Sequence, residues 1–362
     1  MTTTEQLQQV DPEQVEEALG QVMGDFAAAI GVTTLLLGIS SGAWKAVAAA
    51  GPLTPQQLAA EIGTAEPYAR EWLAAQAAAG YLTYDPGAGT FAMPAAVAAV
   101  LTDDAQTGLF SAFGDAIAVM GADLDTFRDR FATGRGFGWH ERSPGHWEAM
   151  ARISDATVLP FLPAWVAALD GVSERLAAGG KVADVGCGYG GALVALAETF
   201  PRASVHGFDY HDASVARARA AAAAAGVEGR VQVDVATAKD YPGAGYDLIT
   251  FFDSLHDLGD PIGALEHARE ALAPDGSVLL VEPEAADRLE DNLNPVGRLW
   301  YSVSTTVCTA NGVAQEGHPL GTVAGEARLR ATAAAAGFTR VRRLEVDAPI
   351  NLLLELRARP DR

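Results

Sequence analysis

One short segment constrains the fold of this chain more than any other: residues 182–191, which read VADVGCGYGG. An apolar, β-prone start leads into glycines at every second position, and residues 192–197 then read as a helix. A strand, a tight glycine turn and a helix bring backbone N–H groups close to a nucleotide-like ligand. Asp209 ends the next predicted strand, 204–208, where a carboxylate accepts hydrogen bonds from ribose hydroxyls. The pattern predicts a site for an adenosine-containing cofactor.

Two cofactor classes fit this glycine loop. Gly186, Gly188 and Gly191 satisfy the GxGxxG pattern of dinucleotide-binding proteins. Gly186, Gly188 and Gly190 satisfy GxGxG, with the acidic Asp184 two positions before it. A dinucleotide loop receives a pyrophosphate at a helix N-terminus, where an additional carboxylate is unfavourable. S-adenosylmethionine has no phosphate and carries a sulfonium and an α-ammonium group. The segment therefore resembles the first motif of class I S-adenosylmethionine-dependent methyltransferases, and we expect that cofactor.

The rest of the C-terminal half alternates predicted strands with predicted helices. In chain order they are helix 213–225, strand 231–235, strand 246–253, helix 261–272 and strand 276–283. This spacing predicts an α/β domain whose parallel sheet has helices on both faces. Two further strands, 339–346 and 351–357, predict a closing antiparallel hairpin. The order of elements resembles the Rossmann-like, seven-stranded, mostly parallel sheet of class I methyltransferases.

The N-terminal half predicts helices followed by a small hairpin. Helices are expected at 11–30, within 38–51, at 54–63 and from 66 to 80, and strands at 81–84 and 90–93. Asp11 before Pro12 and Thr54 before Pro55 are typical N-caps with proline at the first helical position. Helix, helix, hairpin is the winged-helix pattern. The apolar run 26–39 is too short to span a bilayer, and we expect it to form a core helix.

The net charge and the cysteine content limit the binding partners and the cellular compartment expected for this protein. A net charge of −21 disfavours binding to nucleic acid and to an anionic membrane. The candidate recognition helix offers only Arg70 as a base, beside Glu66 and Glu71, so a dimer-forming or substrate-covering role is favoured over DNA binding. Cys187 and Cys308 are too few for a disulfide framework. With no basic N-terminal signal visible, we expect a cytoplasmic protein.

Nearly the full chain resembles bacterial small-molecule methyltransferases of the type that also includes plant phenolic O-methyltransferases. The resemblance implies an N-terminal winged-helix dimerisation domain over 1–110 and a cofactor-binding methyltransferase domain over 171–362. It also implies a helical connector, 111–170, that contributes to the cleft. We therefore expect a homodimer that acts on a small molecule.

His256 is the candidate general base. It follows the fourth predicted strand, at the sheet edge where ligands bind in open parallel sheets. Its surroundings resemble the LHDW stretch of the family, whose histidine is the base in O-methylating members, although Leu258 replaces the tryptophan. The resemblance assigns Glu282 as the carboxylate that orients this base. A second acidic partner known in the family has no clean match, although Glu316 and Glu326 lie nearby.

The expected binding residues come from strand ends, the connector and an insertion at 285–325. The expected cofactor-binding residues are Asp184, Gly186, Cys187, Gly188, Gly190, Asp209, Tyr210, Asp234, Val235 and Asp253. Among these, Asp234 is placed to meet the adenine amino group, and Cys187 is interpreted as a small buried residue. The expected substrate-binding residues are His146, Trp147, Trp300 and Tyr301.

The reaction and the substrate leave alternatives open. O-methylation of a small molecule is the leading hypothesis, and N- or C-methylation are its rivals. A ligand-sensing transcription regulator, an enzyme that keeps the cofactor without transferring a methyl group, and a nicotinamide-dependent dehydrogenase are further hypotheses. No HxxxH or similar spacing indicates a metal site among the histidines at 140, 146, 256 and 318, so we expect no metal.

Overall fold

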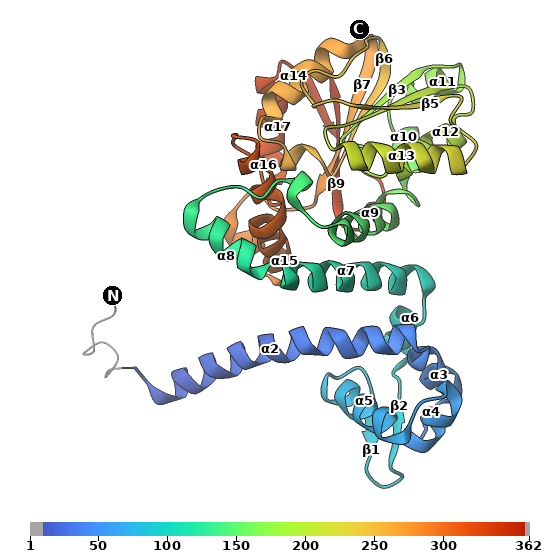
Figure 1. Ribbon diagram of the computed structural model, residues 1–362, viewed down its shortest axis with the longest axis vertical. Coiled ribbons are helices and arrows are strands. Elements are labelled where there is room, and N and C mark those ends of the chain that lie inside the picture. Colours follow the sequence, from blue (N-terminus) through green and yellow to red (C-terminus); the bar gives the residue numbers. More distant parts are fainter. Residues whose placement is uncertain (1–9, 359–362) are drawn as a thin grey trace. The chain divides into compact units, whose positions relative to one another are not determined.

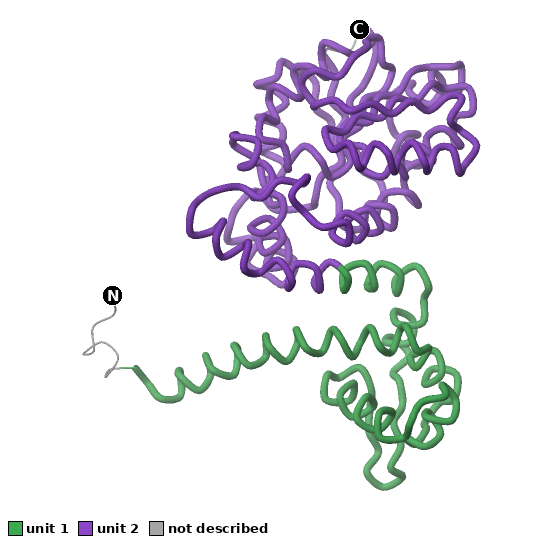
Figure 2. The backbone as a smooth tube through the Cα atoms, viewed as in Figure 1, with its two compact units in different colours: residues 1–115 green, residues 116–362 purple. Residues whose placement is uncertain are grey.

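The computed structural model describes residues 10–358. The chain forms two compact units, residues 1–115 and 116–362 (Figure 2). Helix α7 (Asp104–Ala122) crosses this division. One hydrophobic cluster fills the first unit, and two clusters fill the second. The first unit is mainly helical, whereas the second contains a seven-stranded sheet.

In the first unit, short helices and a β-hairpin surround one apolar core. The elements are α3 (Ala43–Ala50), α4 (Pro55–Ile62), α5 (Glu66–Ala78), β1 (Thr83–Asp85), β2 (Thr90–Ala92) and α6 (Ala95–Leu101). Thr54 and Gln57 form a capping box that starts α4, because each side chain bonds to the backbone N–H of the other residue. Trp44, Leu58 and Leu73 are fully buried in the core. The predicted order of helices and antiparallel hairpin is confirmed.

The N-terminal helix differs from its prediction. Helix α2 (Pro12–Ser40) is a single helix of 29 residues, and it continues through four glycines although each costs about 1 kcal/mol relative to alanine. Its apolar half was expected in the core, but only Gly38 is buried. Within residues 10–358, α2 is also the one helix long and apolar enough to cross a bilayer by length and composition. The prediction of a core helix over 26–39 therefore holds only near its C-terminal end, where Leu35 and Ile39 pack against the core of the first unit.

The second unit contains a sheet with strand order β5-β4-β3-β6-β7-β9-β8. The strands are β3 (Lys181–Val185), β4 (Ser204–Asp209), β5 (Val231–Val235), β6 (Tyr246–Phe252), β7 (Leu272–Pro283), β8 (Arg340–Arg343) and β9 (Asn351–Arg357). The first five strands in this order are parallel, and β9 is antiparallel to both β7 and β8. The predicted fold class and closing hairpin are confirmed. The strand order reverses between β3 and β6, and ligands bind at such switch points.

Helices cover both faces of this sheet because its strands are apolar on both sides. On β6, Leu248 packs into one cluster and the next residue, Ile249, into the other. The first cluster includes residues of α10 (Leu162–Ala167), α11 (Val172–Ala177), α12 (Gly191–Thr199) and α13 (Asp212–Ala224). The second includes residues of α14 (Pro261–Ala271) and α17 (Gly325–Ala335). Figure 1 shows this sheet with helices α10, α12, α13, α14 and α17 around it.

Two further segments complete the second unit. The connector contains α8 (Leu124–Thr133), η1 (Trp139–Glu141) and α9 (Pro144–Val158), and the insertion contains η3 (Leu289–Asn292), α15 (Pro295–Val303), η4 (Ser304–Cys308) and α16 (Thr309–Ala314). The buried Arg142 joins them, because its Nη2 donates to the carbonyl oxygens of Phe137 at 3.2 Å and of Thr306 at 2.8 Å. Segment η4 is a π-helix, a form that occurs frequently at functional sites.

Candidate functional site

A cavity of about 510 Å³ opens at the carboxyl ends of the parallel strands. Its lining includes the residues that follow β3, β4, β5 and β6, together with residues of α9, α15, η4 and α16. In open α/β sheets, ligands bind at this edge beside the switch point. The volume lies within the range of about 300–1,000 Å³ that small-molecule sites occupy.

The glycine loop joins β3 to α12 at this cavity. Gly186 and Gly190 have φ angles of 77° and 83°, in the left-handed region that favours glycine. A Cβ atom on Gly190 would lie 2.8 Å from the Cβ atom of Ala218, so α13 leaves no space for a side chain there. Since α12 starts at Gly191, backbone N–H groups without intrahelical partners lie in the cavity lining.

Two buried aspartates support the loop. Oδ2 of Asp209 accepts a hydrogen bond from the N–H of Gly188 at 3.0 Å, and Oδ1 accepts one from the N–H of His211 at 2.9 Å. Oδ1 of Asp184 accepts a bond from the hydroxyl of Thr250 at 2.7 Å. Burial raises the pKa of Asp209, and it raises the pKa of Asp184 to about 7. Carboxylate oxygens hold further lone pairs, so both groups can still accept hydrogen bonds from a ligand.

A third aspartate at the loop was missed from the sequence. Asp155 of α9 lies against the start of α12, so closely that any side chain at Gly191 would collide with its carboxylate. Burial raises the pKa of Asp155. No motif marks this residue, because its helix meets the loop only through the tertiary fold.

The cavity is strongly acidic. Its lining contains six aspartates: Asp155, Asp184, Asp209, Asp253, Asp257 and Asp260. Within the described chain, the same lining contains one lysine, Lys239, and no arginine. The ammonium group of Lys239 pairs with Asp260 at 3.1 Å. Buried carboxylates favour a cationic ligand, because a nearby positive charge offsets the cost of their desolvation.

His256 lies between two carboxylates at one end of the cavity. Its Nδ1 is 2.5 Å from Oε2 of Glu282, and its Nε2 is 3.2 Å from Oδ1 of Asp257. The other oxygen of Glu282 accepts the N–H of Leu255 at 3.1 Å, which fixes the carboxylate beneath the ring. Burial opposes protonation of His256, but Glu282 and Asp257 outweigh it and raise the pKa of the imidazole above its usual range. The second acidic group at this histidine is therefore Asp257, whereas Glu326 pairs with Arg330 and Arg343.

Asn351, at the start of β9, was also missed. Its Nδ2 donates to Oδ1 of Asp253 at 2.7 Å, while its own Oδ1 is buried without a hydrogen-bond partner and the residue lines the cavity. Asp253 has a positive φ of 48°, a strained conformation for a non-glycine residue, and strain of this kind clusters at functional sites. Burial raises the pKa of Asp253 to about 7.

Aromatic residues of the connector form another part of the lining. The backbone N–H of Trp139 donates to the hydroxyl oxygen of Tyr210 at 3.1 Å and to Oδ1 of Asn311 at 2.8 Å. The indole N–H of Trp147 donates to the carbonyl of Trp139 at 2.8 Å. These bonds hold the connector against the strand ends and the insertion.

The structure brings most of the sequence-predicted cofactor residues together. Those that line the cavity are Asp184, Gly186, Cys187, Gly188, Gly190, Asp209, Tyr210 and Asp253. Asp234 and Val235 do not line it. The carboxylate of Asp234 instead contacts Nε2 of His206 at 2.8 Å and Nη2 of Arg219 at 3.2 Å. The segment after β5, from Ala236 to Lys239, lines the cavity in their place.

The four predicted substrate residues divide in the same way. Trp147 and Trp300 line the cavity, but His146 and Tyr301 do not. His146 is fully buried with its ring 5.3 Å from that of Trp139, and burial lowers its pKa to about 3. Successive side chains of a helix point in different directions, so only one residue of each neighbouring pair, Trp147 of one and Trp300 of the other, lines the cavity.

Two segments of the chain match families of known proteins. Residues 183–278 match the family described as "Methyltransferase domain", and residues 28–103 match the "Rv2258c-like winged HTH domain". A dimethylglycine N-methyltransferase of Parasynechococcus marenigrum (strain WH8102) is 33% identical over 148 residues, which is 40% of this chain and 50% of that protein. The chain thus spans about half the length of this curated relative.

Two solved structures resemble nearly the whole chain. The mitomycin 7-O-methyltransferase MmcR has a TM-score of 0.66 at 18% identity, covering 96% of this chain and 99% of its own. The O-methyltransferase NcsB1 from neocarzinostatin biosynthesis, solved with S-adenosyl-L-homocysteine and 1,4-dihydroxy-2-naphthoic acid, has a TM-score of 0.59 at 21% identity, covering 93% and 98%. At these identities the likeness shows the fold. The second unit therefore has the fold of class I methyltransferases and contains the segment that matches the methyltransferase family, and residues 28–103 match the winged HTH family.

Proposed function

We propose that this protein is an S-adenosylmethionine-dependent methyltransferase that acts on a small molecule. The observation that carries the proposal is the acidic cavity, with six aspartates and a single lysine, at the glycine loop of a methyltransferase domain. A sulfonium and an α-ammonium group suit such a cavity, whereas a pyrophosphate would be repelled by it. A nicotinamide-dependent dehydrogenase is correspondingly disfavoured.

The chain's residues fit this cofactor. Asp209 stands where it can accept bonds from ribose hydroxyls while it holds the loop through Gly188. Asp184 and Asp155 offer carboxylates on either side of the loop for the cationic groups. When bound, the cofactor supplies an electrophilic methyl group on its sulfur.

His256 is the proposed base for an acceptor that must lose a proton. Glu282 fixes the ring through Nδ1, so that Nε2 is the nitrogen on the side of Asp257 and the cavity. Glu282 and Asp257 favour the protonated imidazolium form of His256. The ring must therefore release its Nε2 proton before it can act as a base, and the carboxylate of Asp257, 3.2 Å from Nε2, can accept that proton. A positioned base contributes about 10²–10⁴-fold to such a step.

The proposed acceptor is a small molecule with an apolar or aromatic body. Trp139, Trp147 and Trp300 line the cavity and suit such a group. O-methylation is the reaction we propose first, because His256 lies between Glu282 and Asp257 as a general base would. N-methylation is the rival, supported by the matched N-methyltransferase relative.

The proposal also states that the protein is a homodimer in the cytoplasm. Helix α2 exposes Val15, Leu19, Val22, Phe26 and Ile30 at helical spacing, which we name the α2 stripe. A second copy of this helix would bury the stripe. DNA binding is disfavoured because Arg70, the one basic residue of α5, already pairs with Glu66 and Glu71.

A methyl-transfer assay tests the proposed function. The purified protein is incubated with S-adenosylmethionine and a panel of phenols and amines, and S-adenosylhomocysteine is measured by mass spectrometry. We expect acceptor-dependent product that His256→Ala reduces by about 10²–10⁴-fold for hydroxyl acceptors. Tight cofactor binding with no product from any acceptor would favour an enzyme that retains the cofactor without methyl transfer.

A further inference from the structure

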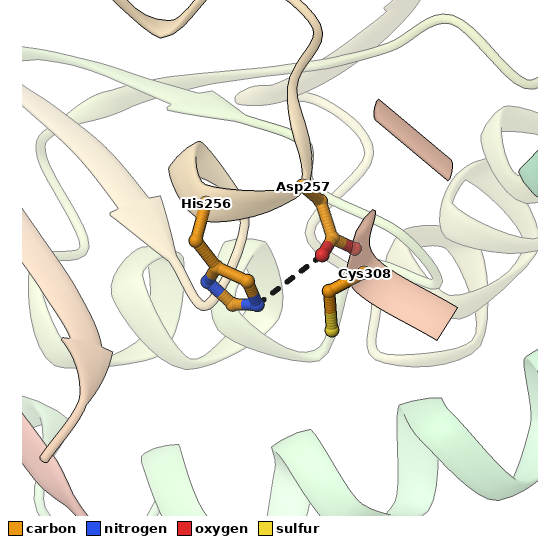
Figure 3. Close-up of side chains that lie close together, drawn as sticks. All are labelled: His256, Asp257 and Cys308. Atoms are coloured by element: carbon orange, nitrogen blue, oxygen red, sulfur yellow. Dashed lines mark ion pairs between the residues drawn. The ribbon is translucent and has the colours of Figure 1, made fainter. Parts of the chain in front are cut away.

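Three side chains with different metal-binding chemistry meet at the base. Nε2 of His256, a carboxylate oxygen of Asp257 and Sγ of Cys308 all lie within 4.8 Å of one another (Figure 3). His256 and Asp257 belong to η2 (Leu255–Asp257), and Cys308 ends the π-helix η4. The cluster lines the cavity, so an ion can reach it from there.

This ligand set suits zinc. Zn²⁺ binds thiolate sulfur, imidazole nitrogen and carboxylate oxygen, and sites with three protein ligands leave a fourth position open. Bond lengths of about 2.0–2.3 Å in a tetrahedron place ligand atoms about 3.5 Å apart, so ligand atoms that lie within 4.8 Å of one another must approach by up to about 1.3 Å. A thiolate and a carboxylate would together neutralise the two charges of the ion.

Two further observations favour a cation at this cluster. Oδ1 of Asp257 is buried and has no hydrogen-bond partner, although it lies 3.2 Å from Nε2 of His256. Glu282 holds the opposite ring nitrogen at 2.5 Å, which leaves Nε2 as the nitrogen available to an ion. A carboxylate behind a metal-binding histidine is the usual support of such a ligand.

We propose that His256, Asp257 and Cys308 form a binding site for a zinc-class divalent ion. On binding, the thiol and the Nε2 position release their protons to solvent, bonds from zinc to sulfur, nitrogen and oxygen form, and no electron is transferred. Because the ion occupies Nε2, it prevents His256 from accepting a proton. Zinc is therefore an inhibitor of the enzyme, a consequence that rests on the proposed methyl transfer, whereas the binding itself does not.

Cobalt titration of the full chain tests the binding. Co²⁺ replaces Zn²⁺ in such sites, and its bond to a thiolate gives a near-ultraviolet charge-transfer band. We expect one equivalent of Co²⁺ to produce this band and Zn²⁺ to remove it. Cys308→Ser should lose the band, while Cys187→Ser, the matched control at the other cysteine, should retain it.

The supporting carboxylate offers a second, graded test. Glu282→Gln should keep the cobalt band and weaken zinc affinity by about 10–100-fold, as loss of an outer-shell partner does. Absence of the band in the wild-type protein, or its persistence in Cys308→Ser, would overturn the site.

Inhibition is measured separately. We expect Zn²⁺ to abolish methyl transfer in parallel with its occupancy of the site, and a chelator to restore the activity. Zinc bound at one equivalent with undiminished turnover would overturn the inhibitory role. A protein that binds zinc but transfers no methyl group would count against the proposed function and leave the binding site supported.

Discussion

Nδ1 of His256 lies 2.5 Å from Oε2 of Glu282, and this contact joins the end of β7 to the turn after β6. It fixes which ring nitrogen points to Asp257 and the cavity. The ring's orientation thus depends on a residue 26 positions away in the sequence.

Loss of the Glu282 charge should therefore slow catalysis without affecting the cofactor. Glu282→Gln keeps the shape of the side chain but removes the carboxylate that orients the base. We expect kcat for a hydroxyl acceptor to fall by at least about tenfold, given that a positioned base contributes about 10²–10⁴-fold. Steady-state kinetics and calorimetry with S-adenosylhomocysteine measure the two effects. The exposed Glu270→Gln is the control, and unchanged kcat in Glu282→Gln would contradict the assignment.

Asp209 and Asp234 should differ in their effect on cofactor binding. Asp209 contacts the glycine loop and lines the cavity, whereas Asp234 is occupied by His206 and Arg219. A hydrogen bond to a charged group contributes about 1.5–3 kcal/mol, so Asp209→Asn should raise the Kd for S-adenosylhomocysteine by about 10–100-fold. Asp234→Asn is the matched control and should leave the Kd unchanged. Equal losses in both variants would show that the cavity is assigned wrongly.

Asp184 should make the stability of the protein depend on pH. Burial raises the pKa of this carboxyl from 3.8 to about 7, so the folded protein keeps a proton that the unfolded chain releases. This contribution to the free energy of unfolding is complete below pH 3.8 and is lost as the pH rises towards 7. Asp184→Asn cannot titrate. Between about pH 5 and pH 7, we expect the wild type to lose about 2 kcal/mol relative to this variant. Urea denaturation measures the difference, and a constant difference across that range would refute the prediction.

The α2 stripe should control assembly. Phe26→Glu places a charge in the centre of the exposed apolar residues, and Gln21→Glu adds the same charge on a different side of the helix. We expect the wild type and Gln21→Glu to be dimers and Phe26→Glu to be a monomer in analytical ultracentrifugation. A wild-type protein that is monomeric, or a Phe26→Glu variant that still dimerises, would exclude this interface.

Local patterns in the sequence predicted much of the fold. The glycine loop, the alternating strands and helices and the capped α4 depend on neighbouring residues, and they appear as expected. The first helix was predicted to end at residue 30, whereas α2 continues to Ser40, because no proline follows residue 30 to stop it. The burial of α2 was overestimated because apolar content alone does not reveal what covers a helix.

The candidate site was most predictable where a strand end or the glycine loop carries the residue, and Trp147 and Trp300 are correct predictions on helices. Asp184, Asp209 and Asp253 follow from the strand pattern, since parallel strands bring their carboxyl ends to one edge. Asp234 does not line the cavity, because successive side chains of a strand point to opposite faces and a shift of one residue changes the surroundings completely. Asp155 and Cys308 come from helices whose approach to the cavity depends on tertiary packing, which no local pattern encodes.

Calorimetric titration of the full chain with S-adenosylhomocysteine and, in parallel, with NAD⁺ tests the central claim most directly. An acidic cavity at the glycine loop predicts saturable binding of S-adenosylhomocysteine at one equivalent per chain and no heat with NAD⁺. Binding of NAD⁺ without binding of S-adenosylhomocysteine would contradict the account.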